Sequence, residues 1–178
     1  GAYEEVLSVG AFDEGSGGLA EFSSRGWTPE YLLKPDVIAP GVSICAPLAT
    51  GSLFDGRGGC EDSDYVSLSG TSMATPHVAG LAAMLSKNVG WSARDIKSAI
   101  STTASPLSFE SPYDHGAGLP RAQQTIWTSG QLPLSFFNET TVNFGFSAQS
   151  VGLASREILV SELLATSTCK DFTGAFTP

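Results

Sequence analysis

A serine stands where a predicted strand gives way to a predicted helix. Tyr65–Leu68 has the short, largely apolar pattern of a strand, and apolar residues after Ser72 recur at helical spacing, at Val78, Leu81 and Leu85. The start of a helix offers unpaired backbone N–H groups and the positive end of the helix dipole. A hydroxyl nucleophile needs such donors, because the oxyanion formed on attack must be stabilised as it develops. Ser72 is therefore a candidate nucleophile.

The helix that follows is expected to be buried on all sides. Small residues occupy the faces that the apolar residues leave, at Ala74, Ala79, Gly80 and Ala83, and a helix that is small or apolar all round is typically packed closely on its neighbours. Pro76 is expected in the first turn, where a missing N–H costs nothing.

Ser72 has a second interpretation, as the N-cap of this helix, since serine and threonine are favoured at that position. The run from Gly70 to Gly80, Gly-Thr-Ser-Met-Ala-Thr-Pro-His-Val-Ala-Gly, favours the nucleophile. It resembles, without a gap, the nucleophile segment of the subtilisin-like serine proteases. The segments FSSRG (22–26) and LKPDVIAPG (33–41) resemble the same family, most closely its pyrolysin- and cucumisin-type branch.

The resemblance extends over about residues 3–125. It implies an extracellular or cell-surface serine endopeptidase that acts on polypeptides and requires no cofactor for its chemistry. Ser72 would attack the peptide carbonyl, its N–H would contribute one oxyanion donor, and Met73 would line the leaving-group side. The residues expected to lie near substrate are Leu68, Ser69, Gly70, Thr71 and Met73.

The order of the catalytic triad creates the main difficulty. In subtilisin-like enzymes the aspartate and the histidine precede the serine, yet the 71 residues before Ser72 contain no histidine. We therefore expect the aspartate, the histidine and the oxyanion asparagine in a missing N-terminal half of the catalytic domain, which would be a partner of this chain. A serine hydroxyl without a general base is a weak nucleophile, so the chain alone is expected to be inactive.

Neither histidine of the chain is expected to replace the missing base. His77 lies five residues after Ser72, roughly 140° around the helix axis, and by resemblance it is a structural core residue. His115 permits an alternative, in which Ser72, Asp95 and His115 follow the order of an α/β-hydrolase-type esterase, although Asp95 is better explained as a helix cap. A further alternative is a non-catalytic subtilase remnant or binding module.

The predicted fold class is α/β, the C-terminal part of a subtilisin-like parallel-sheet domain. Val6–Phe12 and Lys34–Gly41 have the pattern of strands in a parallel sheet, and Val42–Ala46 is expected to pair with the strand at 65–68. Ser92 and Asp95 predict a capping box at the start of a second helix.

Two regions are expected along the chain. Residues 1–127 would form the C-terminal half of the peptidase domain. Residues 128–178 show strand patterns at 132–137, 141–146 and 157–160 and would begin a β-sandwich-like appendage or a linker.

Charge and hydropathy exclude some classes of function. The 178 residues contain nine Lys and Arg against 18 Asp and Glu, a net charge of −9. A chain this acidic is a poor candidate for binding nucleic acid or an anionic membrane, and no apolar run is long enough to span a bilayer. Acidic residues gather in the loop before residue 65 and could attract calcium, but their spacing is not that of a calcium loop, so a solvated loop is favoured. They are Asp55, Glu61, Asp62 and Asp64.

The family resemblance also bears on Asp36. In some members of the family the matching position binds a cation together with backbone carbonyls that match Gly1, Tyr3 and Val6. Lys34 stands where those members have a carboxylate, so we expect no ion at this place.

The three cysteines leave their pairing open. Cys45 and Cys60 flank one loop and could form a disulfide, while buried or loop thiols fit the sequence equally well. Cys169 would remain unpaired in that scheme.

Overall fold

A parallel pair of strands forms the centre of the structure. The structure is a computed structural model, and it describes residues 3–29, 32–55, 59–87, 91–108, 111–131, 135–137, 158–162 and 170–172. Strand β1 (Val9–Asp13) pairs in parallel with β5 (Val37–Pro40), with Val9 opposite Val37 and Phe12 opposite Pro40. The predicted parallel sheet is therefore confirmed, although β1 begins three residues later than expected.

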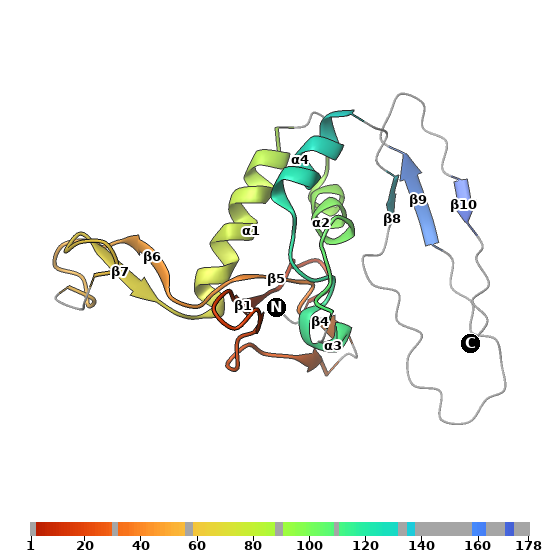
Figure 1. Cartoon of the computed structure of the whole chain (residues 1–178). Helices are drawn as coiled ribbons and strands as arrows, with labels where there is room; N and C mark the ends of the chain where they lie inside the picture. Colours follow the sequence, from red (N-terminus) through yellow and green to blue (C-terminus); the bar gives the residue numbers. More distant parts are fainter. Residues whose placement is uncertain are drawn as a thin grey trace.

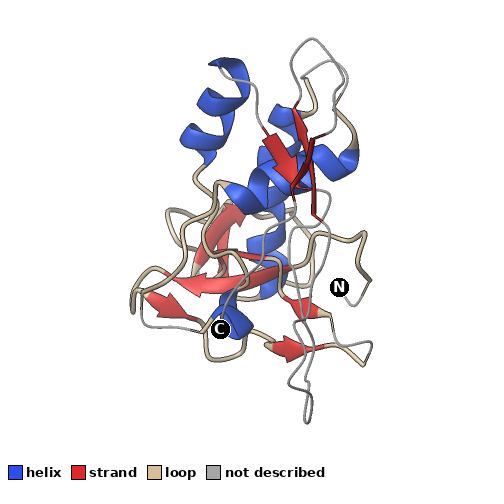
Figure 2. Ribbon diagram, turned by 90° about the vertical axis from the view of Figure 1, so that its right-hand side faces the viewer, coloured by secondary structure: helices blue, strands red, loops and turns tan. Residues whose placement is uncertain are grey.

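One long helix covers this pair. Helix α1 (Thr71–Leu85) packs against β1 and β5 (Figure 1), and in Figure 2 the long helices lie above the layer that holds most of the strands. The core combines apolar residues of both strands with the inner face of α1, the residue that follows β2, and one residue of α2 (Ala93–Thr102). Its buried members are Ala11, Ala20, Val37, Ala39, Ala74, Val78, Leu81, Leu85 and Ile100.

Helix α1 is buried along one face only, so the prediction of burial on all sides is wrong for this chain. Thr75, Ala79, Gly80 and Ala83 are exposed, because no described element packs on their side of the helix. Pro76 is the sixth residue of α1 and lies inside the helix, not in its first turn as predicted. Its missing N–H leaves one carbonyl of the preceding turn without an intrahelical donor.

Short antiparallel pairs surround the central strands. β2 (Gly18–Leu19) pairs with the end of β1, and β3 (Gly26–Trp27) pairs with β4 (Leu33–Lys34). The predicted pairing of the segments near 42–46 and 65–68 is confirmed: β6 (Ile44–Pro47) is antiparallel to β7 (Tyr65–Leu68).

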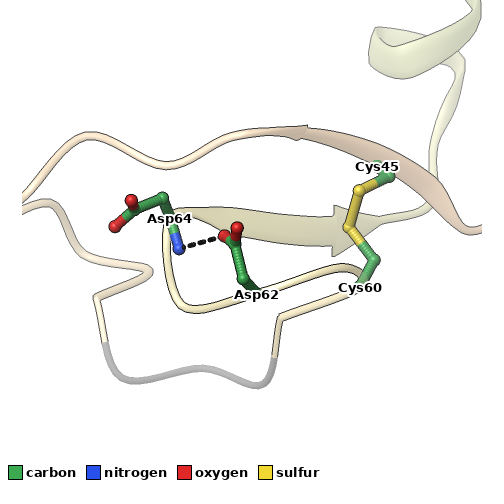
Figure 3. Close-up of a disulfide and its surroundings, with 4 residues drawn as sticks. All are labelled: Cys45, Cys60, Asp62 and Asp64. Carbon is green, nitrogen blue, oxygen red and sulfur yellow. Dashed lines mark hydrogen bonds between the residues drawn. A yellow bond between two sulfur atoms is a disulfide. The ribbon is translucent and has the colours of Figure 1, made fainter.

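The β6–β7 hairpin projects away from the helices (Figure 1) and is closed by a disulfide. The structure joins Cys45 of β6 to Cys60 of the connecting loop, which decides the pairing that the sequence left open. Figure 3 shows this bridge beside the acidic loop, in which the Asp64 N–H donates to Asp62 Oδ1 at 2.8 Å. No cluster of three or more His, Cys, Asp or Glu side chains suited to a metal ion occurs among the described residues.

In the part of the chain that the structure describes, three further helices follow α1. α2 begins with the predicted capping box: Ser92 Oγ accepts from the Asp95 N–H, and Asp95 Oδ2 accepts from the Ser92 N–H. α3 (Pro112–His115) and α4 (Ala122–Gln131) complete the helical part. No described helix is both long enough and apolar enough to cross a bilayer.

The C-terminal region contains a second sheet. β8 (Ser135–Phe137), β9 (Ile158–Glu162) and β10 (Lys170–Phe172) form an antiparallel sheet in the order β10-β9-β8, and β8 lies next to α2 (Figure 1). Two of the three predicted strands of this region overlap β8 and β9. The third, at 141–146, and Cys169 lie outside the described residues, and a β-sandwich stays a prediction.

The exposed face of α1 leads to a first prediction. A Cβ added at Gly80 would meet no atom within 4 Å, so Gly80→Ala should stabilise the 178-residue chain by about 1 kcal/mol through helix propensity. Urea unfolding followed by circular dichroism measures the change, and Ala79→Gly, one residue away on the same exposed side, should lower the free energy of unfolding by a similar amount. Destabilisation by Gly80→Ala would mean that this face is already covered in the chain alone.

Candidate active site

Ser72 is the second residue of α1, and it is not the N-cap. Gly70 occupies the N-cap position, and no side chain there bonds the helix, so the capping interpretation of Ser72 is wrong. The Ser72 side chain is exposed, and its hydroxyl has no hydrogen-bond partner within the described ranges. Of the first N–H groups of the helix, those of Met73 and Ala74 donate to the Gly70 carbonyl, at 3.0 and 3.3 Å. The Ser72 N–H precedes them, and among the described residues no acceptor is found for it.

The turn before Ser72 is hydrogen-bonded to the segment that leaves β5. The Gly70 N–H donates to the Gly41 carbonyl at 2.7 Å, and the Ser43 N–H donates to Ser69 Oγ at 2.9 Å. Ser43 has a positive φ of 54°, a conformation that costs a non-glycine residue some stability. These two bonds fix the position from which α1, and with it Ser72, begins.

Gly41 is essential to this arrangement because two backbones approach closely there. Its N–H donates to the Phe12 carbonyl at 2.9 Å, which joins it to β1. A Cβ at this position would lie 2.7 Å from Ala11 Cβ and 2.9 Å from the Gly70 carbonyl oxygen. Only glycine, which has no Cβ, therefore allows the backbones of β1, the end of β5 and the Ser69–Gly70 turn to approach this closely.

The contact places Ser72 at a favourable edge of the sheet. Gly41 directly follows β5, so the turn that carries Ser72 lies at the carboxyl end of the parallel β1–β5 pair. In open α/β sheets, ligands bind at that edge. The strand-to-helix transition predicted from the sequence thus also satisfies a rule of sheet topology.

The residues expected near substrate directly precede and follow Ser72 in the chain. Leu68 ends β7 and is half-buried, while the exposed Ser69 uses its hydroxyl to accept from Ser43. Thr71 and Met73 are half-buried, and their carbonyl oxygens bond the side chains of the next helical turn, Thr75 Oγ1 at 2.9 Å and His77 Nδ1 at 2.9 Å.

A cavity of ≈ 330 Å³ opens next to Thr71. Its walls come from the start of β1, the 24–29 segment with β3, and the approach to β5. Trp27 forms part of the wall and lies 5.3 Å, centroid to centroid, from the ring of Tyr113 in α3. Val9 and Gly10, in the part of β1 that β2 does not cover, also line the cavity.

The two histidines do not serve Ser72. His77 is exposed, so its expected role as a core residue is wrong, and its Nδ1 faces the Met73 carbonyl. His115 is 1% exposed, with Nδ1 at 2.9 Å from the Gly116 carbonyl. Asp95 is held in its capping box. Within the described part of the chain, no hydrogen bond joins Ser72, Asp95 and His115 into the triad of an esterase.

Comparison with known proteins assigns the family. A family model described as "Subtilase family" matches residues 1–137. The chain belongs to the subtilase family.

Individual subtilases agree with this assignment. The chain is 42% identical over 118 residues to the subtilisin-like protease SBT3.7 of Arabidopsis thaliana, a match that covers 57% of this chain and 14% of that protein. It is 35% identical over 135 residues to the serine protease AprX of Bacillus subtilis, covering 71% and 30%. The CspB protease of Clostridium perfringens has a similar fold, with a TM-score of 0.53 at 28% identity over 71% of this chain and 27% of that one. The chain thus spans less than a third of the length of each of these proteins.

The sequence did not predict the residues after β5 that hydrogen-bond the Ser69–Gly70 turn. The sequence pattern predicts a strand that ends at Gly41 and another that includes Ser43, and it indicates no functional role for either residue. The LKPDVIAPG segment was a signal for Gly41, because it ends on that residue. The Ser43–Ser69 bond joins residues 26 positions apart and has no local signature.

A second prediction concerns Gly41. Gly41→Ala should lower the free energy of unfolding by roughly 1–3 kcal/mol, because the added methyl group must displace Ala11 or the Gly70 carbonyl. Thermal unfolding measures the loss. Gly15→Ala, at an exposed turn whose nearest foreign atom is the flexible side chain of Asp13, is the matched control. Equal stability of the two variants would contradict the close approach described above.

Proposed function

We propose that Ser72 is the nucleophile of a serine endopeptidase that cleaves polypeptides outside the cell or at its surface. The observation that carries the proposal is the exposed Ser72 hydroxyl in the first turn of α1, beside its own unpaired N–H. The Gly70–Gly80 run and the family assignment support the same role.

The geometry supports acyl transfer. Ser72 Oγ attacks the scissile carbonyl carbon while a general base accepts its proton, and the carbonyl oxygen becomes an oxyanion. The Ser72 N–H donates to that oxyanion, assisted by the positive end of the α1 dipole. A single donor of this kind is worth about 10²–10³ in rate. The amine leaves with a proton, and water then hydrolyses the acyl-enzyme.

The base, its aspartate and the second oxyanion donor would come from sequence upstream of residue 1. No histidine precedes Ser72, and neither His77 nor His115 is bonded to it within the described residues. Residues 1–127 would then be the C-terminal half of the peptidase domain, inactive alone, and 128–178 the start of an appendage or a linker. No cofactor enters this chemistry.

Two surfaces support an upstream partner. The face of α1 that carries Thr75, Ala79, Gly80 and Ala83 is exposed and has no charged group, and small residues allow another backbone to approach closely. The edge of β1 at Val9 is uncovered by β2 and lines the 330 Å³ cavity. An unpaired edge and an apolar face are seldom left open in soluble domains. The stabilising effect of Gly80→Ala should therefore reverse in the longer protein.

A third prediction tests the nucleophile. In protein that includes its upstream sequence, Ser72→Ala should lower peptide hydrolysis roughly 10⁴-fold or more, because the acyl-enzyme can no longer form. Hydrolysis of a fluorogenic casein substrate is measured, with Ser63→Ala, an exposed serine of the acidic loop, as the control that keeps full activity. Undiminished hydrolysis by Ser72→Ala would assign the reaction to another residue, and an inactive wild type would favour the non-catalytic remnant.

A further inference from the structure

The structure surrounds one buried carboxylate with two ammonium groups. Lys34 Nζ lies 2.7 Å from Asp36 Oδ2, and Lys97 Nζ lies 3.1 Å from Asp36 Oδ1. The side chain of Asp36 is 5% exposed, and those of Lys34 and Lys97 are 11% and 12% exposed. Ser8 donates to Oδ2 from its N–H and its hydroxyl, at 2.7 and 2.9 Å. Both oxygens of the carboxylate are therefore occupied.

The same ammonium groups also bind backbone carbonyl oxygens near the N-terminus. Lys34 Nζ donates to the Val6 carbonyl at 2.9 Å. Lys97 Nζ donates to the Glu4 carbonyl at 2.5 Å and to the Val6 carbonyl at 3.2 Å. The cluster therefore ties three parts of the chain together: the 4–8 segment, the approach to β5, and α2.

A metal ion does not fit this arrangement. A hard cation such as Ca²⁺ takes six to eight oxygen ligands at about 2.3–2.6 Å. Asp36 and the carbonyls could supply part of such a set, which is what the family resemblance implies. Here two positive nitrogen groups already occupy these oxygens, and the cluster of two ammonium groups and one carboxylate has a formal charge of +1, which repels a further cation.

Burial disfavours the charged form of Lys97, and the surrounding ion pair and hydrogen bonds offset this cost. Desolvation lowers the pKa of Lys97, and the charge of Asp36 opposes that shift. A buried ion pair holds only where its remaining hydrogen bonds are satisfied, and here the carbonyls of Glu4 and Val6 and the groups of Ser8 satisfy them.

We propose that Lys34 and Lys97 together replace a structural metal ion as the cationic centre that binds Asp36 and the 4–6 carbonyls. The anchor is then a permanent part of the chain. The region between the N-terminal segment, β5 and α2 keeps its structure at any calcium concentration, and only removal of both ammonium groups exposes the oxygen ligands to an ion.

The test compares thermal unfolding of the 178-residue chain with 5 mM Ca²⁺ and with EDTA, since the whole cluster lies within residues 4–97. The wild-type midpoint should differ by less than about 1 °C between the two conditions. The double variant Lys34→Glu with Lys97→Met should unfold roughly 5–10 °C earlier in EDTA and should recover part of that loss in Ca²⁺. Lys87→Met, an exposed lysine, is the matched control and should behave as wild type.

A second measurement covers the case in which the double variant does not fold. Isothermal titration of Ca²⁺ into the wild type and into Asp36→Asn locates any bound ion. Equal titrations of the two proteins, with or without binding elsewhere, support the proposal. A wild-type binding event that Asp36→Asn removes would overturn it, and so would a double variant as stable as Lys87→Met in EDTA.

Discussion

The candidate site depends on the hydrogen bonds that join the Ser69–Gly70 turn to the segment after β5. The bond from the Gly70 N–H to the Gly41 carbonyl fixes the first residue of α1 against the carboxyl end of the parallel pair. Helix direction then orients the free N–H of Ser72 and exposes its hydroxyl. Because Gly41 also bonds Phe12 of β1, the sheet, the turn and the helix are linked through one small residue. A displacement there would move the nucleophile and its oxyanion donor together.

Local patterns predicted the elements well, and long-range packing explains where they failed. The capping box at Ser92 was readable because it needs only residues 92–95. The parallel pair was readable from two short buried runs. The prediction that α1 is buried on all sides was wrong. Small residues such as Ala79 and Gly80 indicate that another segment can pack closely on a helix, but they do not identify that segment. The core role predicted for His77 came from the family resemblance alone, and the structure leaves this side chain exposed. No local pattern could have shown that Lys97 reaches Asp36, since a helix side chain meets a residue just before β5, 61 positions earlier.

The structure combines rigid internal anchors with uncovered surfaces. The Asp36 cluster and the Cys45–Cys60 disulfide hold the N-terminal segment and the β6–β7 hairpin by contacts within the chain. Among the described residues, the face of α1 at Thr75, Ala79, Gly80 and Ala83 is exposed, and β2 does not reach the edge of β1 at Val9. Contacts within the chain can therefore preserve the geometry of the turn around Ser72.

Covalent labelling of Ser72 by a fluorophosphonate tests the central claim most directly, because the probe reacts only with a serine hydroxyl that a base has activated. The probe is applied to residues 1–178 and to the same chain preceded by its upstream sequence, and the modified peptide is mapped. The account predicts labelling at Ser72 in the longer protein alone. Labelling of the 178-residue chain by itself would contradict the absence of a general base, and labelling at a residue other than Ser72 in the longer protein would contradict the assignment of the nucleophile.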